Sequence, residues 1–247
     1  MLRKIGGYAF AILFILAGWQ LTAMALSSPA LPGPADAFPM VVKYFGDLWP
    51  AFCVSLYRVV VAMLIGTVLA IPVGLVCGRS PRVDAVFAPI LYFLYPLPKV
   101  VLLPVLIVLM GLADAPKITL IALTIFFQVL VTVRDAAKSV PEDSVLSVRS
   151  LGASRWDIYR HVIIPATLPD LFTALRISSG TAVAILFFAE SIAGSTGLGY
   201  FIVDAWALLS YPKMFAGIIA MAVLGVVLYE VFECAERRLT RWRRASK

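Results

Sequence analysis

Three charged side chains lie within otherwise apolar stretches of the sequence: Arg58, Lys99 and Glu190. A charge in such a stretch is costly and usually faces the protein interior or a water-filled path. Arg58 stands near one end of its stretch, so its long side chain can reach outward to a polar interface. For Lys99 and Glu190, a structural ion pair and a position on a solute pathway are equally good interpretations.

Uncharged polar side chains occur in two further apolar stretches. They are Gln128, Ser178, Ser179 and Thr181. Such groups often bond to a backbone carbonyl or to a neighbouring helix, and small residues also let helices approach closely. Together with Lys99 and Glu190, they are the candidate lining of a translocation pathway.

Residues for catalysis or metal binding are sparse. His161 is the only histidine, and no partners surround it in the sequence at metal-ligand spacing. The run Gly194–Gly199 lacks the lysine of a phosphate-binding loop, and no Gly-x-x-x-x-Gly-Lys-Ser/Thr run is present. We therefore predict no catalytic residue, no metal site and no ATP site in this chain, and an outer hairpin or re-entrant turn at Gly194–Gly199.

The composition indicates that lipid surrounds much of the chain. Its 247 residues are 62% hydrophobic and 14% charged. A soluble domain has about 45–50% apolar and about 25% charged residues. A fold of this size cannot bury so much apolar surface in water, because its surface is large relative to its volume.

Six segments are long and apolar enough to span a bilayer, which takes roughly 20 residues. They are Ile5–Leu26, Phe52–Gly78, Ala85–Leu112, Ala115–Val133, Leu171–Ala193 and Met214–Ala235. The third contains four prolines, so it should be kinked or be a surface segment followed by a span. The first could instead be a signal peptide, but its apolar stretch is long for one. We expect an all-α membrane protein with one domain over residues 1–247.

The basic residues predict the orientation. Most of the 21 Lys and Arg residues lie on the same side as the N-terminus, while the loops on the other side hold only Lys43, Lys117 and Lys213. Lys and Arg collect in cytoplasmic loops, so both termini should be cytoplasmic. The basic C-terminal tail is explained by contact with anionic lipid, without nucleic acid. The Pro- and Gly-rich stretch 27–50 should be an irregular periplasmic connection.

The residue pattern of the one sizeable cytoplasmic loop, 134–170, predicts two short helices. Ser139 and Glu142 fit a capping box for a helix that ends near Leu151, where Gly152 can adopt a left-handed conformation. Ser154 and Asp157 can cap a second helix in the same way.

The prolines Pro165 and Pro169 should end that second helix before the fifth span. On it, Trp156, Tyr159 and Ile163 are spaced to share one face. That face either packs on the protein itself and at the lipid interface, or docks a cytoplasmic partner.

A resemblance favours docking. Leu151-Gly152-Ala153-Ser154, followed by Val162-Ile163-Ile164-Pro165, resembles the cytoplasmic signature of binding-protein-dependent importer permeases. That signature reads Glu-Ala-Ala, three residues, Gly, nine residues, then Ile-x-Leu-Pro. Further runs resemble its nitrate/sulfonate/taurine branch: Leu103-Pro104, Gly111-Leu112, Ala189-Glu190-Ser191, Gly197-Leu198-Gly199-Tyr200 and Arg237-Arg238-Leu239-Thr240-Arg241-Trp242. One position departs, because Leu146 stands where the signature has Glu.

The resemblance implies a type I ABC importer permease: six transmembrane helices with a cytoplasmic coupling helix, in the bacterial inner membrane. It implies two ATPase subunits that bind ATP and Mg, a periplasmic substrate-binding protein and a second permease copy, so a homodimer is expected. The solute would be a nitrate-, sulfonate- or taurine-like anion or a vitamin precursor. The residues implied to contact the ATPase are Glu142, Asp143, Arg149, Leu151, Gly152, Ala153, Ser154, Trp156, Tyr159 and Pro165.

Two alternatives remain. An ion- or proton-coupled secondary transporter would usually show paired repeats or acidic residues at mid-depth, and few acids here lie there. An intramembrane enzyme would need a catalytic constellation, and one histidine does not supply it.

Overall fold

The structure is a computed structural model that describes the backbone of residues 2–240 and the side chains of residues 10–240. Over that range the chain is helical, with short connections and no strand, so the prediction of an all-α protein is confirmed. Some of the basic residues that predict the orientation lie outside the described range. They are Arg3 and Lys4, whose side chains are not described, and the tail residues Arg241, Arg243, Arg244 and Lys247. Trp242 of the family-like run lies outside it as well.

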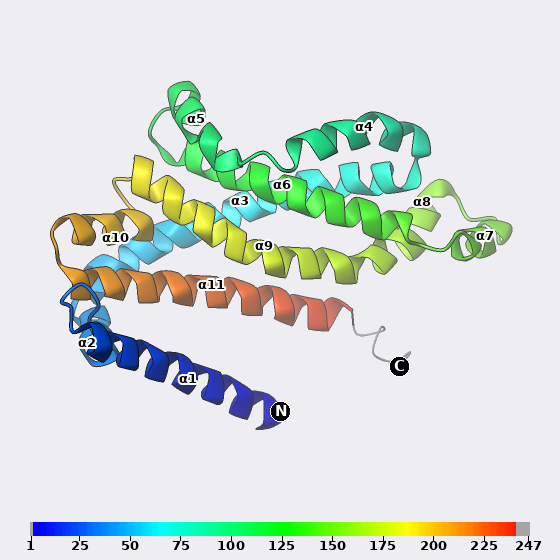
Figure 1. The fold of residues 1–247 in the computed structure, drawn as a ribbon. Coiled ribbons are helices and arrows are strands. Elements are labelled where there is room, and N and C mark those ends of the chain that lie inside the picture. The colour runs from blue at the N-terminus through cyan, green and yellow to red at the C-terminus, as the bar shows by residue number, and fades with distance from the viewer. Residues whose placement is uncertain (1, 241–247) are drawn as a thin grey trace. The chain divides into compact units, whose positions relative to one another are not determined.

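The helices follow one another along the chain, as Figure 1 shows. They are α1 (Leu2–Leu26), α2 (Pro34–Lys43), α3 (Phe45–Arg79), α4 (Pro81–Leu94), the 3₁₀ helix η1 (Lys99–Leu102), α5 (Leu103–Met110), α6 (Asp114–Lys138), α7 (Glu142–Ser150), α8 (Arg155–Ile158), the π-helical turn η2 (Tyr159–Ile163), α9 (Ile164–Ala193), α10 (Leu198–Ala207) and α11 (Tyr211–Leu239).

Four of the predicted spans are confirmed as helices long and apolar enough to cross a membrane. They are α3, α6, the continuous run of α8, η2 and α9, and α11. The third predicted span is the pair α4 and η1–α5, bent by 83°. The part of α1 whose side chains are described, Phe10–Leu26, is a shorter apolar helix. The count of six spans therefore stays a prediction.

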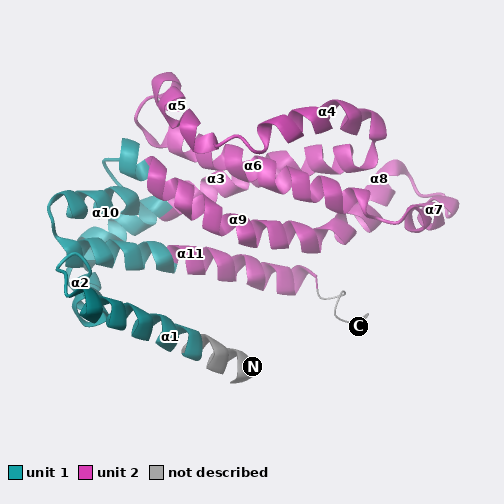
Figure 2. Ribbon diagram, viewed as in Figure 1, with its two compact units in different colours: residues 1–55, 190–223 teal, residues 56–189, 224–247 magenta. Residues whose placement is uncertain are grey.

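The chain divides into two compact units, coloured separately in Figure 2. Unit 1 comprises residues 1–55 and 190–223, and unit 2 comprises residues 56–189 and 224–247. The divisions fall inside α3, α9 and α11. The expectation of one domain over residues 1–247 stays a prediction.

Aromatic contacts join three helices of unit 1. The Trp19 ring of α1 stacks on Phe215 of α11, with 5.4 Å between ring centroids, and the Trp19 indole donates to the Pro32 carbonyl at 3.0 Å. The ammonium of Lys213 lies 4.9 Å from the centre of the Phe201 ring of α10. Aromatic pairs contribute about 0.5–1.5 kcal/mol beyond the apolar area they bury.

In unit 2, small residues recur every four positions along α3. They are Ala62, Gly66, Ala70, Gly74 and Gly78. A Cβ added at Gly66 would lie 2.6 Å from the carbonyl oxygen of Ala122, and one at Gly74 would lie 3.0 Å from that of Leu130. The backbones of α3 and α6 thus approach as closely as small residues at helix interfaces permit.

Prolines produce the sharp bend after α4. Pro96 and Pro98 have no N–H with which to continue the helix, and they disfavour helical backbone in the residues before them. The chain therefore leaves α4 at Leu94, turns, and enters η1 at Lys99. The expected kink is confirmed, and Figure 1 shows the turn between α4 and α5.

One expectation for the connections is wrong, and two helices extend what the sequence indicated. The stretch 27–50 contains the helix α2, which begins at Pro34, a residue suited to the first helical turn because it needs no N–H partner there. The helix α3 starts at Phe45, seven residues before the start of the predicted span Phe52–Gly78, which it contains. The helix α10 was not predicted, because its ten residues are too few to show as a span.

Candidate functional site

The predicted coupling segment, residues 139–165, forms α7, α8 and η2 at one end of unit 2 (Figure 1). Gly152 has a φ of +84°, so it ends α7 in the left-handed conformation that the sequence predicted. Ser154 and Asp157 form the predicted capping box: the Asp157 N–H donates to the Ser154 hydroxyl at 3.2 Å, and the Ser154 N–H donates to the Asp157 carboxylate at 3.0 Å.

The coupling segment has both buried and exposed apolar side chains. Val140, Val145, Ile158 and Ile163 are buried and anchor it to the rest of unit 2. Three large apolar side chains are exposed: Leu146 at 49%, Leu151 at 85% and Trp156 at 67%. Exposed apolar side chains that gather in a large patch mark a surface that contacts another protein or a membrane.

The acidic first turn of α7 is held within the chain. Arg79, the last residue of α3, donates to the Glu142 carboxylate at 2.8 Å and to the Val140 carbonyl at 3.3 Å. The Glu142 carboxylate, predicted to contact the ATPase, is thus tethered to α3, although 62% of its side chain remains exposed.

The other end of the segment runs without interruption into α9. The π-helical turn Tyr159–Ile163 lies directly before Pro165, and the Ile164 N–H donates to the Tyr159 carbonyl. The π-helical turn accommodates Pro165 at the start of α9. The α-helix also continues through Pro169, so neither proline ends the helix, contrary to the prediction.

Two further local expectations are wrong. Ser139 does not cap α7; it ends α6, and its hydroxyl donates to the Ala136 carbonyl at 2.9 Å. The π-helical turn also changes the spacing along this stretch, so Ile163 is buried while Trp156 is exposed, and the two do not form one uniform face. His161 is exposed within this turn.

The remaining predicted coupling residues lie along the same segment. Asp143 is in the first turn of α7, Arg149 in its last turn, Leu151 at its C-cap, Ala153 in the following turn, Tyr159 at the start of η2 and Pro165 in the first turn of α9.

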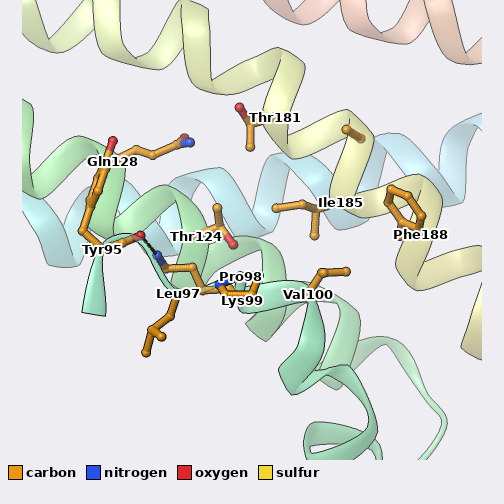
Figure 3. Close-up of a pocket in the computed structure, with 11 residues that line it drawn as sticks. Tyr95, Leu97, Pro98, Lys99, Val100, Thr124, Gln128, Thr181, Ile185 and Phe188 are labelled. Carbon is orange, nitrogen blue, oxygen red and sulfur yellow. Dashed lines mark hydrogen bonds between the residues drawn. The ribbon is translucent and has the colours of Figure 1, made fainter. Parts of the chain in front are cut away.

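A cavity of about 340 Å³ lies at the bend between α4 and η1, within unit 2. Figure 3 shows its lining from three places in the sequence: the bend itself, α6 and α9. The lining residues are Tyr95, Leu97, Pro98, Lys99, Val100, Thr124, Gln128, Thr181, Ala184, Ile185 and Phe188. The structure thus brings together three predicted pathway residues, Lys99, Gln128 and Thr181.

The Lys99 ammonium stabilises the end of α4. It donates to the Leu94 carbonyl at 3.1 Å and to the Tyr95 carbonyl at 2.5 Å, and it lies 4.9 Å from the centre of the Phe127 ring. A cation is favourable at a helix C-terminus, where carbonyls lack partners. An ammonium has three donors, so this arrangement leaves one N–H for another partner.

The other predicted pathway residues lie elsewhere. Ser178 and Ser179 are buried and are not part of the cavity lining, and the Ser179 hydroxyl donates to the Arg176 carbonyl at 2.7 Å. Glu190 belongs to unit 1 and is fully buried. Its carboxylate accepts from the Ser55 hydroxyl at 2.8 Å and from the Gly199 N–H at 2.8 Å. The structure favours a structural role for Glu190 at the start of α10.

Arg58 was expected to reach outward to a polar interface, but it does not. Its side chain is 3% exposed and donates to the Asp114 carboxylate at 2.6 Å and 2.8 Å. Arg134, predicted in a cytoplasmic loop, is likewise buried in α6 and paired with Asp84 of α4. Sequence position alone could not show these partners, which are 56 and 50 residues away.

Comparisons with known proteins find one matching family and several relatives. The family described as "Binding-protein-dependent transport system inner membrane component" matches residues 70–241. The taurine transport system permease protein TauC of Escherichia coli (strain K12) is 33% identical, over 91% of this chain and 84% of the relative. The putative aliphatic sulfonates transport permease protein SsuC of Bacillus subtilis (strain 168) is 31% identical, over 98% of this chain and 90% of the relative.

Solved structures with the same fold are also transporters. An inward-facing MetNI methionine ABC transporter matches with a TM-score of 0.66 and 20% identity, over 80% of this chain and 98% of that chain. A bacterial ABC transporter involved in the import of alginate matches with a TM-score of 0.66 and 17% identity, over 96% of this chain and 97% of that chain. These matches show a type I importer permease fold.

Proposed function

The chain belongs to the family of binding-protein-dependent transport system inner membrane components, and we propose that it carries a small anion into the cell. It is the multi-pass permease subunit of an ABC importer, and this family favours the importer over an ion- or proton-coupled carrier. The solute would be sulfonate-, taurine- or nitrate-like, as in the names of its relatives. A periplasmic binding protein would deliver it.

The exposed apolar side chains of the coupling segment carry this proposal. Leu151 and Trp156 stand on either side of Gly152, and both are more than half exposed. A separate ATPase subunit, which binds ATP and Mg, would cover them. Leu146, at the position where the family signature has Glu, is also exposed, so docking there would rest on apolar contact rather than on a carboxylate.

The segment is built to pass a displacement to two membrane helices. Arg79 ties the start of α7 to α3, and η2 continues α8 into α9. Closure of two ATPase subunits around bound ATP would move this segment in each copy of a permease homodimer. The route enclosed by the dimer would then open outward, and hydrolysis would reset it.

The orientation follows from the same arrangement. An ATPase works in the cytoplasm, so the coupling segment must lie there. The bias of Lys and Arg toward that side of the membrane supports cytoplasmic termini.

Substitution of Gly152 tests the coupling. A Cβ added at Gly152 would meet no atom within 4 Å, but a φ of +84° costs an L-residue about 1–2 kcal/mol. The leucine side chain of Gly152→Leu would also change the docking surface. We expect normal membrane insertion and ATP hydrolysis that no longer drives uptake. Membrane insertion, ATPase activity and uptake of labelled taurine would be measured in vesicles that contain the whole transporter.

A matched variant separates backbone strain from docking. Gly111 has a φ of +80° and open space around it, and it lies outside the coupling segment. We expect Gly111→Leu to retain coupling. Normal uptake by Gly152→Leu would contradict the assignment of this segment.

A further inference from the structure

The cavity at the α4–η1 bend has two polar groups with unused bonding capacity. Lys99 has one N–H beyond its two carbonyl partners. The Gln128 carboxamide oxygen is buried and has no hydrogen-bond partner among the described residues. A buried polar atom without a partner costs free energy and calls for a physical reason.

A bound solute supplies that reason. We propose that this cavity is a recognition site of the permease itself for a small organic anion that also carries a hydrogen-bond donor. The proposal rests on the proposed function and deepens it. The ammonium of Lys99 attracts the anionic group, and the Gln128 oxygen accepts from an amino or hydroxyl group of the solute.

The shape of the cavity fits such a solute. Its volume of about 340 Å³ is near the lower end of the roughly 300–1,000 Å³ that ligand pockets have. Figure 3 shows Ile185 and Phe188 along one side and Lys99 and Gln128 along the other. A short carbon chain can pack on the first pair while its polar ends meet the second. The Thr181 hydroxyl adds another donor at the α9 wall.

The bend explains why the charge is tolerated there. Lys99 follows Pro98, and it donates to the carbonyls of Leu94 and Tyr95 at the end of the broken helix. These two bonds and the nearby Phe127 ring fix the ammonium at the cavity. A lysine in a continuous span would have no such carbonyls, because the helix itself would use them.

Binding to the full chain in phosphatidylcholine nanodiscs tests the site without a binding protein or an ATPase. The probes are taurine, ethanesulfonate, which lacks the amino group, and ethyl methyl sulfone, which lacks the charge. We expect the wild type to bind taurine more tightly than ethanesulfonate and not to bind the sulfone. Equal binding of the sulfone and ethanesulfonate, or no binding of either sulfonate, would overturn the proposal.

Two variants assign the roles. Lys99→Met should weaken binding of both sulfonates by about tenfold or more, because a charged hydrogen bond is lost. Gln128→Leu should reduce taurine affinity to that of ethanesulfonate and leave ethanesulfonate unchanged. Wild-type affinities in Lys99→Met, or a preserved taurine preference in Gln128→Leu, would refute the corresponding role.

Control variants cover the possibility that Lys99→Met fails to fold. Lys99→Arg keeps both the charge and the contact with the helix end, and it should retain anion binding. Lys43→Met removes another lysine that lies over a tyrosine ring, and it should change nothing. The wild-type comparison with the sulfone needs no variant at all.

Failure of this inference is distinguishable from failure of the importer assignment. Co-purification of an ATPase with the chain tests only the importer assignment. A chain that carries an ATPase but binds no sulfonate would refute only the cavity. A chain that binds sulfonates through Lys99 without an ATPase would refute only the importer assignment.

Discussion

At the residue scale, a buried carboxylate organises the turn before α10. Glu190 accepts from the Ser55 hydroxyl and from the Gly199 N–H, and the Ser55 oxygen accepts from the Leu198 N–H at 2.8 Å. Gly197 completes the turn with a φ of +102°. The N-terminal N–H groups of a helix need acceptors, and here side chains supply them in place of water. This network fixes the position at which α10 begins.

Ser55→Ala should loosen that turn. It removes the acceptor of the Leu198 N–H and one donor to Glu190, and an unsatisfied buried group costs about 1–3 kcal/mol. The Leu198 amide should therefore exchange hydrogen about 10–100-fold faster, since each 1.4 kcal/mol is a factor of ten. Hydrogen exchange read by mass spectrometry measures this.

A matched serine serves as the control. The hydroxyl of Ser28 accepts from the Ala30 N–H at 3.3 Å on the surface of the same unit. Ser28→Ala should leave exchange at Leu198 unchanged. Equal exchange at Leu198 in Ser55→Ala and the wild type would show that the network does not hold the turn.

At the element scale, the contact between α3 and α6 depends on residues with no side chain or only a methyl group. The small residues at every fourth position of α3 form a stripe, and the carbonyls of Ala122 and Leu130 on α6 lie against it. Such contacts bring many backbone atoms into van der Waals range, which is a main source of helix association in lipid. Both helices contribute to unit 2, so this contact supports the α6 side of the cavity.

Gly66→Ala should destabilise the protein measurably, although it adds only one methyl group. The new Cβ would lie 2.6 Å from a backbone oxygen, so α3 or α6 must shift. Overpacking of this kind costs typically about 1–3 kcal/mol. The fraction of monodisperse protein that remains after heating in detergent measures the loss.

Gly225 in α11 provides the comparison. Its added Cβ would meet only a Val183 methyl group at 4.0 Å, so Gly225→Ala should be tolerated. Equal heat resistance of Gly66→Ala and Gly225→Ala would contradict close packing of α3 on α6.

At the scale of the whole molecule, orientation in the membrane is the property that function requires. The coupling segment must face the ATPase, and the loops on the other side must face the binding protein. Basic residues predict this arrangement because Lys and Arg are retained in the cytoplasm during insertion. Two exposed residues, Ser28 and Leu151, lie on opposite sides in the predicted topology.

Cysteine labelling tests the orientation. Single cysteines would be introduced as Ser28→Cys or Leu151→Cys after Cys53, Cys77 and Cys234 have been replaced. A membrane-impermeant maleimide should label the first variant in intact spheroplasts and the second only after permeabilisation. The reverse pattern would contradict cytoplasmic termini and the importer assignment together.

The sequence by itself determined those features that follow from local chemistry. Apolar length identified α3, α6, α9 and α11, because lipid selects for it directly. Pro96 and Pro98 determined the bend, and Gly152, Ser154 and Asp157 determined the turn and cap of the coupling segment. Each of these depends on a residue and its nearest neighbours, so a single sequence is enough.

Only the tertiary structure decided which distant groups meet. The sequence alone did not show that Arg58 pairs with Asp114, or that Glu190 accepts a hydrogen bond from Ser55, 135 residues away. It also did not show that Lys99, Gln128 and Thr181 share one cavity while Ser178 and Ser179 do not line it. Such contacts depend on how helices pack side by side. The partner of a buried polar group is therefore set by the fold, although the need for a partner is already visible in the sequence.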